Sequence, residues 1–401
     1  MWIVCQIGAR EHYAIARALE RKGELAAMVT DFWVSKRHWM GILPGSKRLR
    51  DRVHADLVLA VVRAPNLTML SFELQQRLKK RRGWALNMKR NSLFQRKAIS
   101  VVSKIAKQGS ATTLFSYSYA ARDLFSYAKQ RELRCALGQI DPGPEEERIV
   151  AAEHLRYPQL GSKWEPAPAS YWESWHVEVE LADVIIVNSE WSRQCLLKEG
   201  IPDQKLRVIP LVYKYVAPVP APGLGEDPIS KQPKLGESEG REDKIFKVLF
   251  LGQVNLRKGI GRLLEAAKFL EEEKIQITLA GPSEVDSSSW ADLPNVEWLG
   301  SIPRSQVGEL YEKSDVFILP TLSDGYAITQ LEALSRGLPV IASANCGAAV
   351  RHGVNGWILD DLEPETIAKA ILDARNENLK PVSPNVSFNM EDLGDALSDL
   401  A

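Results

Sequence analysis

A polar loop between two apolar runs carries the residues of this chain best suited to binding an anion. The stretch 319–342, LPTLSDGYAITQLEALSRGLPVIA, places Gly325 in the loop and begins a helical pattern near Ala327. Backbone N–H groups in the first turn of a helix have no partner within the helix, and the helix dipole adds positive potential there. The sequence therefore predicts an anion site beside Tyr326, Ala327 and Ile328.

Two carboxylates accompany this predicted anion site. Asp324 stands at the mouth of the loop, and Glu332 follows eight residues later, near the middle of the predicted helix. A carboxylate at position 332 has the acceptor oxygens to bind both hydroxyls of a ribose. The alternative is that Asp324 caps the helix and Glu332 is a solvated helix residue. The residues by themselves leave both interpretations open.

The spacing from Asp324 to Glu332, followed by the run 337–341, GLPVI, resembles the Glu-x7-Glu signature of glycosyltransferase family 4. The resemblance extends over Lys247–Ala374 and includes, in the family's order, Leu249-Phe250-Leu251-Gly252, Arg257-Lys258-Gly259, Leu279-Ala280-Gly281, Gly300-Ser301-Ile302 and Gly353-Val354-Asn355-Gly356. Upstream, Leu181-Ala182-Asp183 and Val208-Ile209-Pro210 resemble the end of the family's N-terminal domain. The resemblance implies an α/β protein of the GT-B fold, with two Rossmann-like domains whose mostly parallel sheets face a central cleft.

The resemblance also implies roles for individual residues. Glu332 would contact the ribose of a nucleotide-sugar donor, and Asp324 would lie beside the transferred sugar. Lys258 would neutralise the charge that develops on the diphosphate, unless it is an ordinary exposed lysine. Lys258 and helix N-termini can balance this charge, so we expect no cofactor and no metal. The implied donor-binding set is Gly252, Gln253, Arg257, Gly281, Ile302, Gly325, Tyr326, Ala327, Ile328 and Glu332.

The chain departs from the family pattern at two places. Gln253 stands five residues before Lys258, where the family usually has Arg, so one phosphate clamp is lost unless Arg257 replaces it. Many members carry a His near the donor sugar in the N-terminal domain, but the corresponding stretch 115–119, FSYSY, has none. His12 is our candidate for that catalytic position, and a surface or packed histidine is the alternative. These departures put activity, more than fold, in question.

Two further strand ends carry candidate residues. Gly8 and Arg10 follow the first apolar run, where the family keeps a loop that meets acceptor or donor phosphate, and we predict that they bind the acceptor. A single glycine does not make a dinucleotide-binding fingerprint. Asp141 and the run 145–147, EEE, follow another predicted strand. They either face the acceptor or belong to a solvated loop, and the solvated loop is the simpler interpretation.

Charge is unevenly distributed along the chain. Lys and Arg total 51, as do Asp and Glu, yet 18 basic residues stand against four acidic ones between Asp31 and Gly109. Within the basic segment 33–107 these residues alternate with Trp and Leu, which suits an anionic membrane surface, where each cation contributes about 1 kcal/mol. A solvated helical insertion is the main alternative, and we expect no nucleic acid as a partner.

The 401 residues suffice for two domains. Residues 217–243 contain Pro, Gly and charges without an aromatic residue, a composition typical of a flexible linker. We predict an acceptor-binding domain over 1–216, with a basic insertion over about 31–110, a linker over 217–245, a nucleotide-sugar domain over 246–376, and a tail over 377–401 with a helix.

Apolar runs that end in Gly, Pro or Ser predict parallel strands whose ends line a crevice. The predicted strands are Trp2–Ile7, Leu25–Thr30, Thr113–Tyr117, Cys135–Gln139, Val184–Asn188, Lys247–Leu251, Gln276–Ala280, Val296–Leu299, Val316–Leu319, Val340–Ala342 and Trp357–Leu359. The predicted helices are Tyr13–Lys22, Tyr119–Arg131, Trp172–Leu181, Ile260–Glu272, Ser305–Lys313, Ile328–Ser335, Pro364–Ala374 and Asn389–Leu400.

Cysteine usage and hydropathy indicate the compartment. The four cysteines are scattered without a CxxC pair, which is typical of reduced thiols in a cytosolic protein. The N-terminus lacks the basic start of a signal peptide, and no run of 18 apolar residues occurs. We expect a cytoplasmic protein, peripheral on the inner face of the membrane if the basic segment binds there.

Together these features predict a retaining glycosyltransferase that moves a hexose from a nucleotide diphosphate sugar to a glycan or lipid-linked acceptor. Three alternatives stay open: a nucleotide-sugar epimerase of the same fold, a phosphorylase or sugar-phosphate synthase with a small soluble acceptor, and a non-catalytic nucleotide- or glycan-binding protein.

Overall fold

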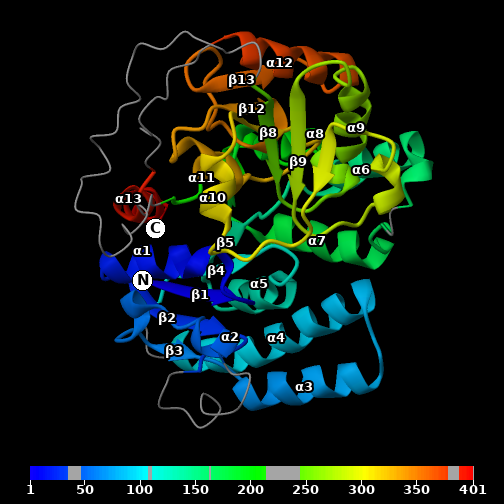
Figure 1. Ribbon diagram of the computed structural model, residues 1–401. Helices are drawn as coiled ribbons and strands as arrows, with labels where there is room; N and C mark the ends of the chain where they lie inside the picture. The colour runs from blue at the N-terminus through cyan, green and yellow to red at the C-terminus, as the bar shows by residue number, and fades with distance from the viewer. Residues whose placement is uncertain (35–46, 107–110, 162–163, 214–243, 378–387, 401) are drawn as a thin grey trace.

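Two parallel sheets form the two halves of the molecule (Figure 1). The computed structural model describes residues 1–34, 47–106, 111–161, 164–213, 244–377 and 388–400. The N-terminal sheet has seven strands in the order β3-β2-β1-β4-β5-β6-β7, and the C-terminal sheet has six in the order β10-β9-β8-β11-β12-β13. Residues 217–243 of the predicted linker lie outside the described residues, as do residues 35–46 of the basic segment.

The strands confirm the apolar runs identified in the sequence. The N-terminal strands are β1 (Trp2–Gln6), β2 (Leu25–Thr30), β3 (Val62–Arg63), β4 (Thr113–Tyr117), β5 (Arg134–Gly138), β6 (Val184–Val187) and β7 (Leu206–Val208). The C-terminal strands are β8 (Phe246–Leu251), β9 (Ile275–Ala280), β10 (Val296–Trp298), β11 (Val316–Leu319), β12 (Val340–Ser343) and β13 (Gly356–Leu359). Only β3 and β7 were not predicted; both are short, partly exposed strands at the two edges of the sheet.

Helices connect the strands and cover both faces of the sheets. In the N-terminal half they are α1 (Ala14–Arg21), α2 (Lys47–Arg50), α3 (Asn66–Leu78), α4 (Gly83–Ala106), α5 (Arg122–Lys129), α6 (Pro144–Arg156), α7 (Ala169–Leu181) and α8 (Glu190–Lys198). In the C-terminal half they are α9 (Ile260–Lys268), α10 (Val307–Glu312), α11 (Ile328–Leu334), α12 (Pro364–Asn376) and α13 (Met390–Ser398). Helices α2, α3, α4, α6 and α8 were not among the predicted helices, although α2, α3 and α4 lie in the predicted basic insertion.

The first predicted helix begins one residue later than expected. Glu11, His12 and Tyr13 all have positive φ, at 51°, 49° and 61°, so α1 begins only at Ala14. Non-glycine residues adopt this left-handed conformation at a cost of roughly 1 kcal/mol or more each. The turn after β1 is therefore a strained segment at the C-terminal end of a central strand.

Helix α6 joins the two halves through packing and ion pairs. Tyr157, just after α6, belongs to the hydrophobic core of the C-terminal sheet and lies against Gly261 of α9. Glu153 of α6 is 3% exposed and accepts two hydrogen bonds from Arg262 of α9, both at 2.8 Å. A buried carboxylate requires such a partner, so this pair ties α6 to the C-terminal half.

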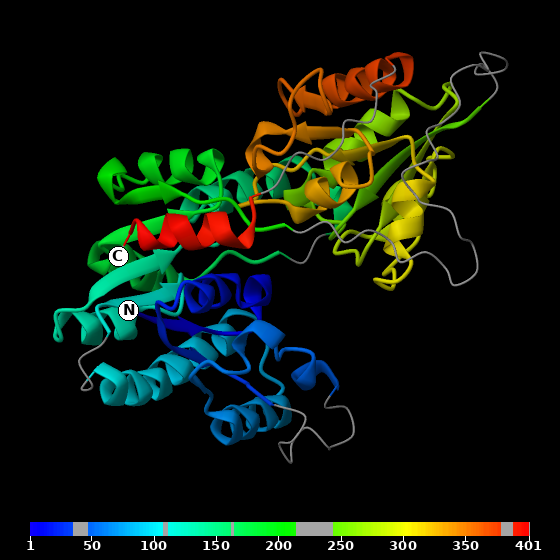
Figure 2. The ribbon, with the colours of Figure 1, turned by 90° about the vertical axis from the view of Figure 1, so that its left-hand side faces the viewer.

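The tail helix confirms the predicted helical pattern and packs on the N-terminal half (Figure 2). Asn389 begins α13 with a capping box, in which its side chain and that of Asp392 accept hydrogen bonds from each other's backbone N–H groups. Leu393 and Leu397 join the core around β1 and α1. Lys22 of α1 pairs with Asp395 at 2.5 Å, which fixes the helix on this face.

Cys5, Cys135, Cys195 and Cys346 are all buried and free. Across the described ranges, no helix combines the length and apolarity that a membrane span requires.

Candidate functional site

A buried ion pair lies where the C-terminal domain faces the cleft. Lys258 ends the short 3-10 helix η8 (Leu256–Lys258), and its ammonium donates to Asp324 Oδ2 in the loop between β11 and α11. The two side chains are 12% and 19% exposed. Burial would raise the pKa of Asp324, but the charges of Lys258 and Arg257 outweigh it and lower the pKa below its ordinary value. Asp324 is therefore ionised at neutral pH.

Arg257 joins this pair to the N-terminal domain. Its Nη1 donates to the Ser323 carbonyl at 3.2 Å and lies 3.8 Å from Asp324 Oδ2. The same nitrogen lies 3.7 Å from Oε1 of Glu146, in the first turn of α6. Gln253, unlike Arg257, is exposed, and it lines the pocket between the two domains that is described below. Whether Arg257 replaces the arginine that the family resemblance places at position 253 stays a prediction.

Two glycines allow the loops of this site to approach one another. A Cβ on Gly259 would lie 1.9 Å from the carbonyl oxygen of Pro320, and φ at Gly259 is 77°. A Cβ on Gly281 would lie 1.8 Å from the carbonyl oxygen of Gly252. No side chain fits at either position, so these close approaches explain the glycines that follow Lys258 and β9.

The other residues predicted to bind the donor lie in loops and helix starts of the C-terminal half. Ala327 is the N-cap of α11 without a side-chain cap, and Ile328 begins the helix with 40% of its surface exposed. Tyr326 and Ile302 are partly buried against the C-terminal core. Glu332 is half-buried one turn into α11, where its Oε2 accepts from the Tyr311 hydroxyl at 3.1 Å. This contact holds the carboxylate at a fixed place.

The N-terminal candidates lie around the turn after β1. Gly8 has φ of 75° and donates its N–H to Asp31 at 2.8 Å. The Arg10 guanidinium lies over the Tyr117 ring at 5.5 Å, and its charge partly opposes the burial that raises the pKa of Asp141. His12 is exposed, and its electrostatic influence acts on His54 beside α1. The roles proposed for these residues stay predictions.

The Asp324 loop touches the N-terminal domain directly. A Cβ on Gly325 would lie 2.5 Å from the carbonyl oxygen of Ile140, at the end of β5. Trp191 of α8 donates its Nε1–H to Ser323 Oγ at 3.1 Å. The cleft is thus narrow at Asp324, and Gly325 is required for this contact as well as for the loop.

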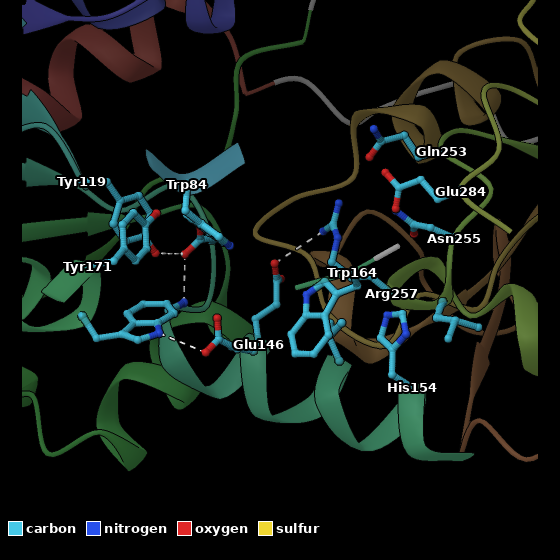
Figure 3. A pocket seen from close by; sticks show the side chains of 16 residues that line it. Trp84, Tyr119, Glu146, His154, Trp164, Tyr171, Gln253, Asn255, Arg257 and Glu284 are labelled. Atoms are coloured by element: carbon cyan, nitrogen blue, oxygen red, sulfur yellow. Dashed lines mark hydrogen bonds and ion pairs between the residues drawn. The ribbon is translucent and has the colours of Figure 1, made fainter. Parts of the chain in front are cut away.

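Beside this contact the cleft widens into a pocket of about 280 Å³ (Figure 3). Its N-terminal wall consists largely of α6 and α7 with the start of α4, and its C-terminal wall is the β8–α9 loop with Glu284. The lining residues are Trp84, Tyr119, Asp141, Gly143, Glu146, Glu147, Val150, His154, Trp164, Tyr171, Trp172, Gln253, Asn255, Leu256, Arg257 and Glu284.

The acidic residues around 141–147 are not a solvated loop, so the simpler interpretation of the sequence was wrong. Burial raises the pKa of Asp141, although hydrogen bonds from Tyr119 and Gly143 favour its charged form. Burial, with the nearby charges of Asp141 and Asp324, raises the pKa of Glu146 to about 8, although Arg257 opposes the shift. Both carboxyl groups face the interdomain pocket.

The aromatic residues of the pocket were missed as a group in the sequence, because they come from three distant segments, at Trp84, at Tyr119 and at Trp164 with Tyr171. Helix α6, which carries Glu146, did have recognisable signals. Pro144 stands at its first position, three glutamates occupy its first turn, and His154 and Arg156 occupy its last. These signals predict a helix even though its buried face is not strongly apolar.

Part of the chain is similar in sequence to known glycosyl transferases. Residues 231–384 match the family model described as Glycosyl transferases group 1. The chain is 26% identical over 200 residues to an uncharacterized 41.2 kDa protein in the cps region of Klebsiella pneumoniae, covering 49% of this chain and 53% of that protein. It is also 26% identical over 155 residues to N,N'-diacetylbacillosaminyl-diphospho-undecaprenol alpha-1,3-N-acetylgalactosaminyltransferase of Campylobacter jejuni, covering 37% of each. The chain thus spans about half or less of the length of these relatives.

Among solved structures, Anabaena Alr3699/HepE in complex with UDP superimposes with a TM-score of 0.59 at 14% identity, covering 100% of this chain and 99% of that chain. At this identity the likeness concerns the fold alone. The chain has the GT-B fold, and its residues 231–384 match a family of glycosyl transferases.

Proposed function

We propose that this chain is a retaining glycosyltransferase that moves a hexose from a nucleotide diphosphate sugar to a hydroxyl of a glycan or lipid-linked acceptor. The observation that carries the proposal is the buried Lys258–Asp324 pair, with Arg257 beside it, in the cleft of a GT-B fold. The match of residues 231–384 to glycosyl transferases supports it. So do the UDP bound in the Anabaena structure and the lipid-diphosphate substrate named for the Campylobacter relative.

The charges in the cleft suit this reaction. The acceptor oxygen bonds to the anomeric carbon, the bond from that carbon to the diphosphate breaks, and the hydroxyl proton leaves with the nucleoside diphosphate. Negative charge grows on the departing diphosphate, and preorganised cations lower the energy of that state. In our proposal Lys258 and Arg257 supply this charge without a metal ion, Asp324 binds the transferred sugar, and Glu332 binds the ribose.

Nucleotide binding tests the donor site. Thermal unfolding is followed with UDP, GDP, ADP, CMP and their common sugars, on the wild type and on Glu332→Ala. A ligand at 100 times its Kd adds about 2.7 kcal/mol, which raises Tm by roughly 5–10 °C for domains of this size. Glu312→Ala is the matched control, because Glu312 is an exposed glutamate on α10. We expect one nucleotide class to stabilise the wild type and Glu312→Ala but not Glu332→Ala.

The products separate the remaining possibilities. Transfer requires an acceptor and releases the nucleoside diphosphate, whereas an epimerase converts the donor alone. A phosphorylase or sugar-phosphate synthase turns over with a small soluble acceptor. Nucleotide binding without turnover in any of these assays leaves the non-catalytic alternative. If no nucleotide raises Tm, the donor site proposed around Lys258 and Glu332 is refuted.

We further propose that helices α3 and α4 hold the protein on an anionic membrane surface, where a lipid-linked acceptor is found. Leu67 and Leu78 of α3 are 63% and 85% exposed. The exposed basic residues of these helices and their connection are Arg77, Lys79, Lys80, Arg81, Arg82, Lys89, Arg96, Lys97 and Lys104. Apolar side chains combined with cations on one face are typical of helices that bind the membrane interface.

A further inference from the structure

The interdomain pocket has walls of aromatic rings on two sides. Tyr119 and Tyr171 stack with centroids 4.6 Å apart, and Trp84 lies 4.8 Å from Tyr171. Facing them in Figure 3, Trp164 stacks on His154 at 4.9 Å. Ring faces carry partial negative charge and attract the slightly positive C–H groups of a ligand with a flat apolar side.

The polar groups of the pocket are mainly hydrogen-bond acceptors. Four carboxyl groups line it, and Arg257 is the one Lys or Arg among the lining residues. Glu147 and Glu284 already accept hydrogen bonds, from Trp172 Nε1 at 3.1 Å and from Asn255 Nδ2 at 3.2 Å. Oε2 of Glu146 is buried without a hydrogen bond of good geometry among the described residues, and the Ser323 hydroxyl lies beside this carboxyl. A buried acceptor of this kind requires a donor, such as a ligand hydroxyl.

Additional negative charge is disfavoured in this pocket. Burial raises the pKa of Asp141 and of Glu146, the latter to about 8 and with the charges of Asp141 and Asp324 contributing. A site that resists the ionisation of its own carboxyl groups also resists a phosphate or carboxylate on a ligand. The ligand that fits is therefore uncharged, rich in hydroxyl donors, and flat on one side.

Arg257 connects this pocket to the proposed donor site. Its Nη1 lies 3.7 Å from Glu146 Oε1 and 3.8 Å from Asp324 Oδ2. The Arg257 guanidinium thus lies between a ligand bound against Glu146 and Asp324, the carboxylate proposed to bind the transferred sugar.

We infer that this pocket is the acceptor subsite and that it takes an uncharged sugar ring, stacked on Trp164 or the Tyr171 side, with a hydroxyl hydrogen-bonded to Glu146. The inference rests on the proposed function, because it names the substrate class of the same cleft. Any phosphate of a lipid-linked acceptor then lies outside the pocket.

Tryptophan fluorescence measures this binding directly, because Trp84, Trp164 and Trp172 line the pocket. The probes are the methyl glycosides of glucose, galactose, mannose and N-acetylglucosamine, each paired with its uronate or 6-phosphate. Titrations are made with and without the nucleotide found to stabilise the protein, and calorimetry gives each Kd independently. We expect at least one neutral glycoside to bind about tenfold or more tightly than its charged partner, a difference of about 1.4 kcal/mol.

Variants locate the binding. Trp164→Ala and Glu146→Ala should each raise the Kd of the neutral glycoside about tenfold, the loss typical of a central contact. Trp33→Ala is the matched control, because Trp33 is also half-buried but packs on Tyr13, outside the pocket. Its Kd should match that of the wild type, and the Tm of each variant shows that it is folded.

The outcomes separate this inference from the proposed function. If a nucleotide stabilises the protein but charged sugars bind as well as neutral ones, the acceptor subsite is wrong and the donor site stands. The same holds if Trp164→Ala and Glu146→Ala bind glycosides as the wild type does. If no nucleotide binds, the proposed function fails, whatever the glycosides do.

Discussion

At the scale of single residues, the cleft depends on a charge balance around Asp324. Lys258→Met removes the ammonium that donates to this carboxylate and leaves Asp324 with Arg257 at 3.8 Å. Breaking a buried pair on one side costs about 3–5 kcal/mol, because the remaining charge stays buried. We expect the free energy of unfolding to fall by about 3 kcal/mol, measured by denaturant titration.

A double-mutant cycle distinguishes this pair from ordinary packing. Asp324→Asn in the Lys258→Met background should recover most of the lost stability, whereas strictly additive losses contradict a charge pair. Lys313→Met is the matched control, because its ion pair with Glu309 is exposed and contributes under about 1 kcal/mol. Because folding lowers the pKa of Asp324 below its unfolded value of 3.8, the ionised carboxylate stabilises the folded protein above pH 3.8. This stabilisation is lost as the pH falls from 3.8 through the lower folded pKa. The difference in free energy of unfolding between wild type and Asp324→Asn should therefore shrink as the pH falls through this interval.

Residue-level prediction succeeded where a motif is contiguous and failed where a site is assembled from distant segments. Lys258 and Asp324 were each identified by their place in an ordered set of motifs, and the fold brings them into contact, which was not predicted. Trp84 and Trp164 meet at the pocket only through the packing of α4, α6 and α7, which no local spacing encodes. Glu146 was considered, but its burial depends on the opposite domain.

At the scale of elements, Gly259 determines where Lys258 stands. Gly259→Ala requires a left-handed alanine and also drives Cβ into the carbonyl oxygen of Pro320, so the η8 turn must move away from β11. Gly353→Ala is the matched control, because Gly353 has φ of 71° and nothing within 4 Å of its Cβ position. The control should lose only about 1 kcal/mol, the cost of the backbone conformation. Gly259→Ala should lose clearly more, measured by denaturant titration.

The variants Gly259→Ala and Gly353→Ala also test the proposed donor site. Displacement of η8 moves Lys258 and Arg257 together, so Gly259→Ala should also weaken nucleotide binding, whereas Gly353→Ala should bind nucleotide as the wild type does. Equal stability losses in the two variants would mean that the close approach to Pro320 is unimportant.

Element prediction depended on how each element is buried. Strands such as β1 and β11 are buried along their whole length and appear as apolar runs. Helix α6 buries Glu153 instead, because Arg262 of the other domain pairs with it. A helix whose buried face contains a carboxylate gives little apolar periodicity, so only the residues at its two ends indicate the helix in the sequence.

At the scale of the whole molecule, a formal net charge of zero conceals a polarised surface. The basic residues gather on α3, α4 and their connection, and these helices lie at the side of the N-terminal half away from the C-terminal sheet (Figure 1). A surface so placed can meet a bilayer while the cleft stays open to a donor in solution. Each cation near an anionic surface contributes about 1 kcal/mol.

Vesicle co-sedimentation tests this arrangement. We expect the protein to bind phosphatidylglycerol vesicles, to bind phosphatidylcholine vesicles much less, and to be released at high salt, because the Debye length falls from about 10 Å at 0.1 M to about 3 Å at 1 M. Replacing the four consecutive cations 79–82 with serine should weaken binding at least about tenfold. The control replaces four exposed cations of the C-terminal domain, Lys268, Arg304, Lys313 and Arg351.

Both variants lose the same net charge, so their comparison separates the effect of where the charge lies from the effect of how much charge there is. If overall charge alone drives vesicle binding, the two variants weaken equally and the α3–α4 surface has no special role. If only the 79–82 variant is released, the location of the charge matters, and the exposed Leu67 and Leu78, at the two ends of α3, become the next positions to change. Serine at these leucines should then reduce binding that persists at high salt, because apolar insertion is not screened by ions.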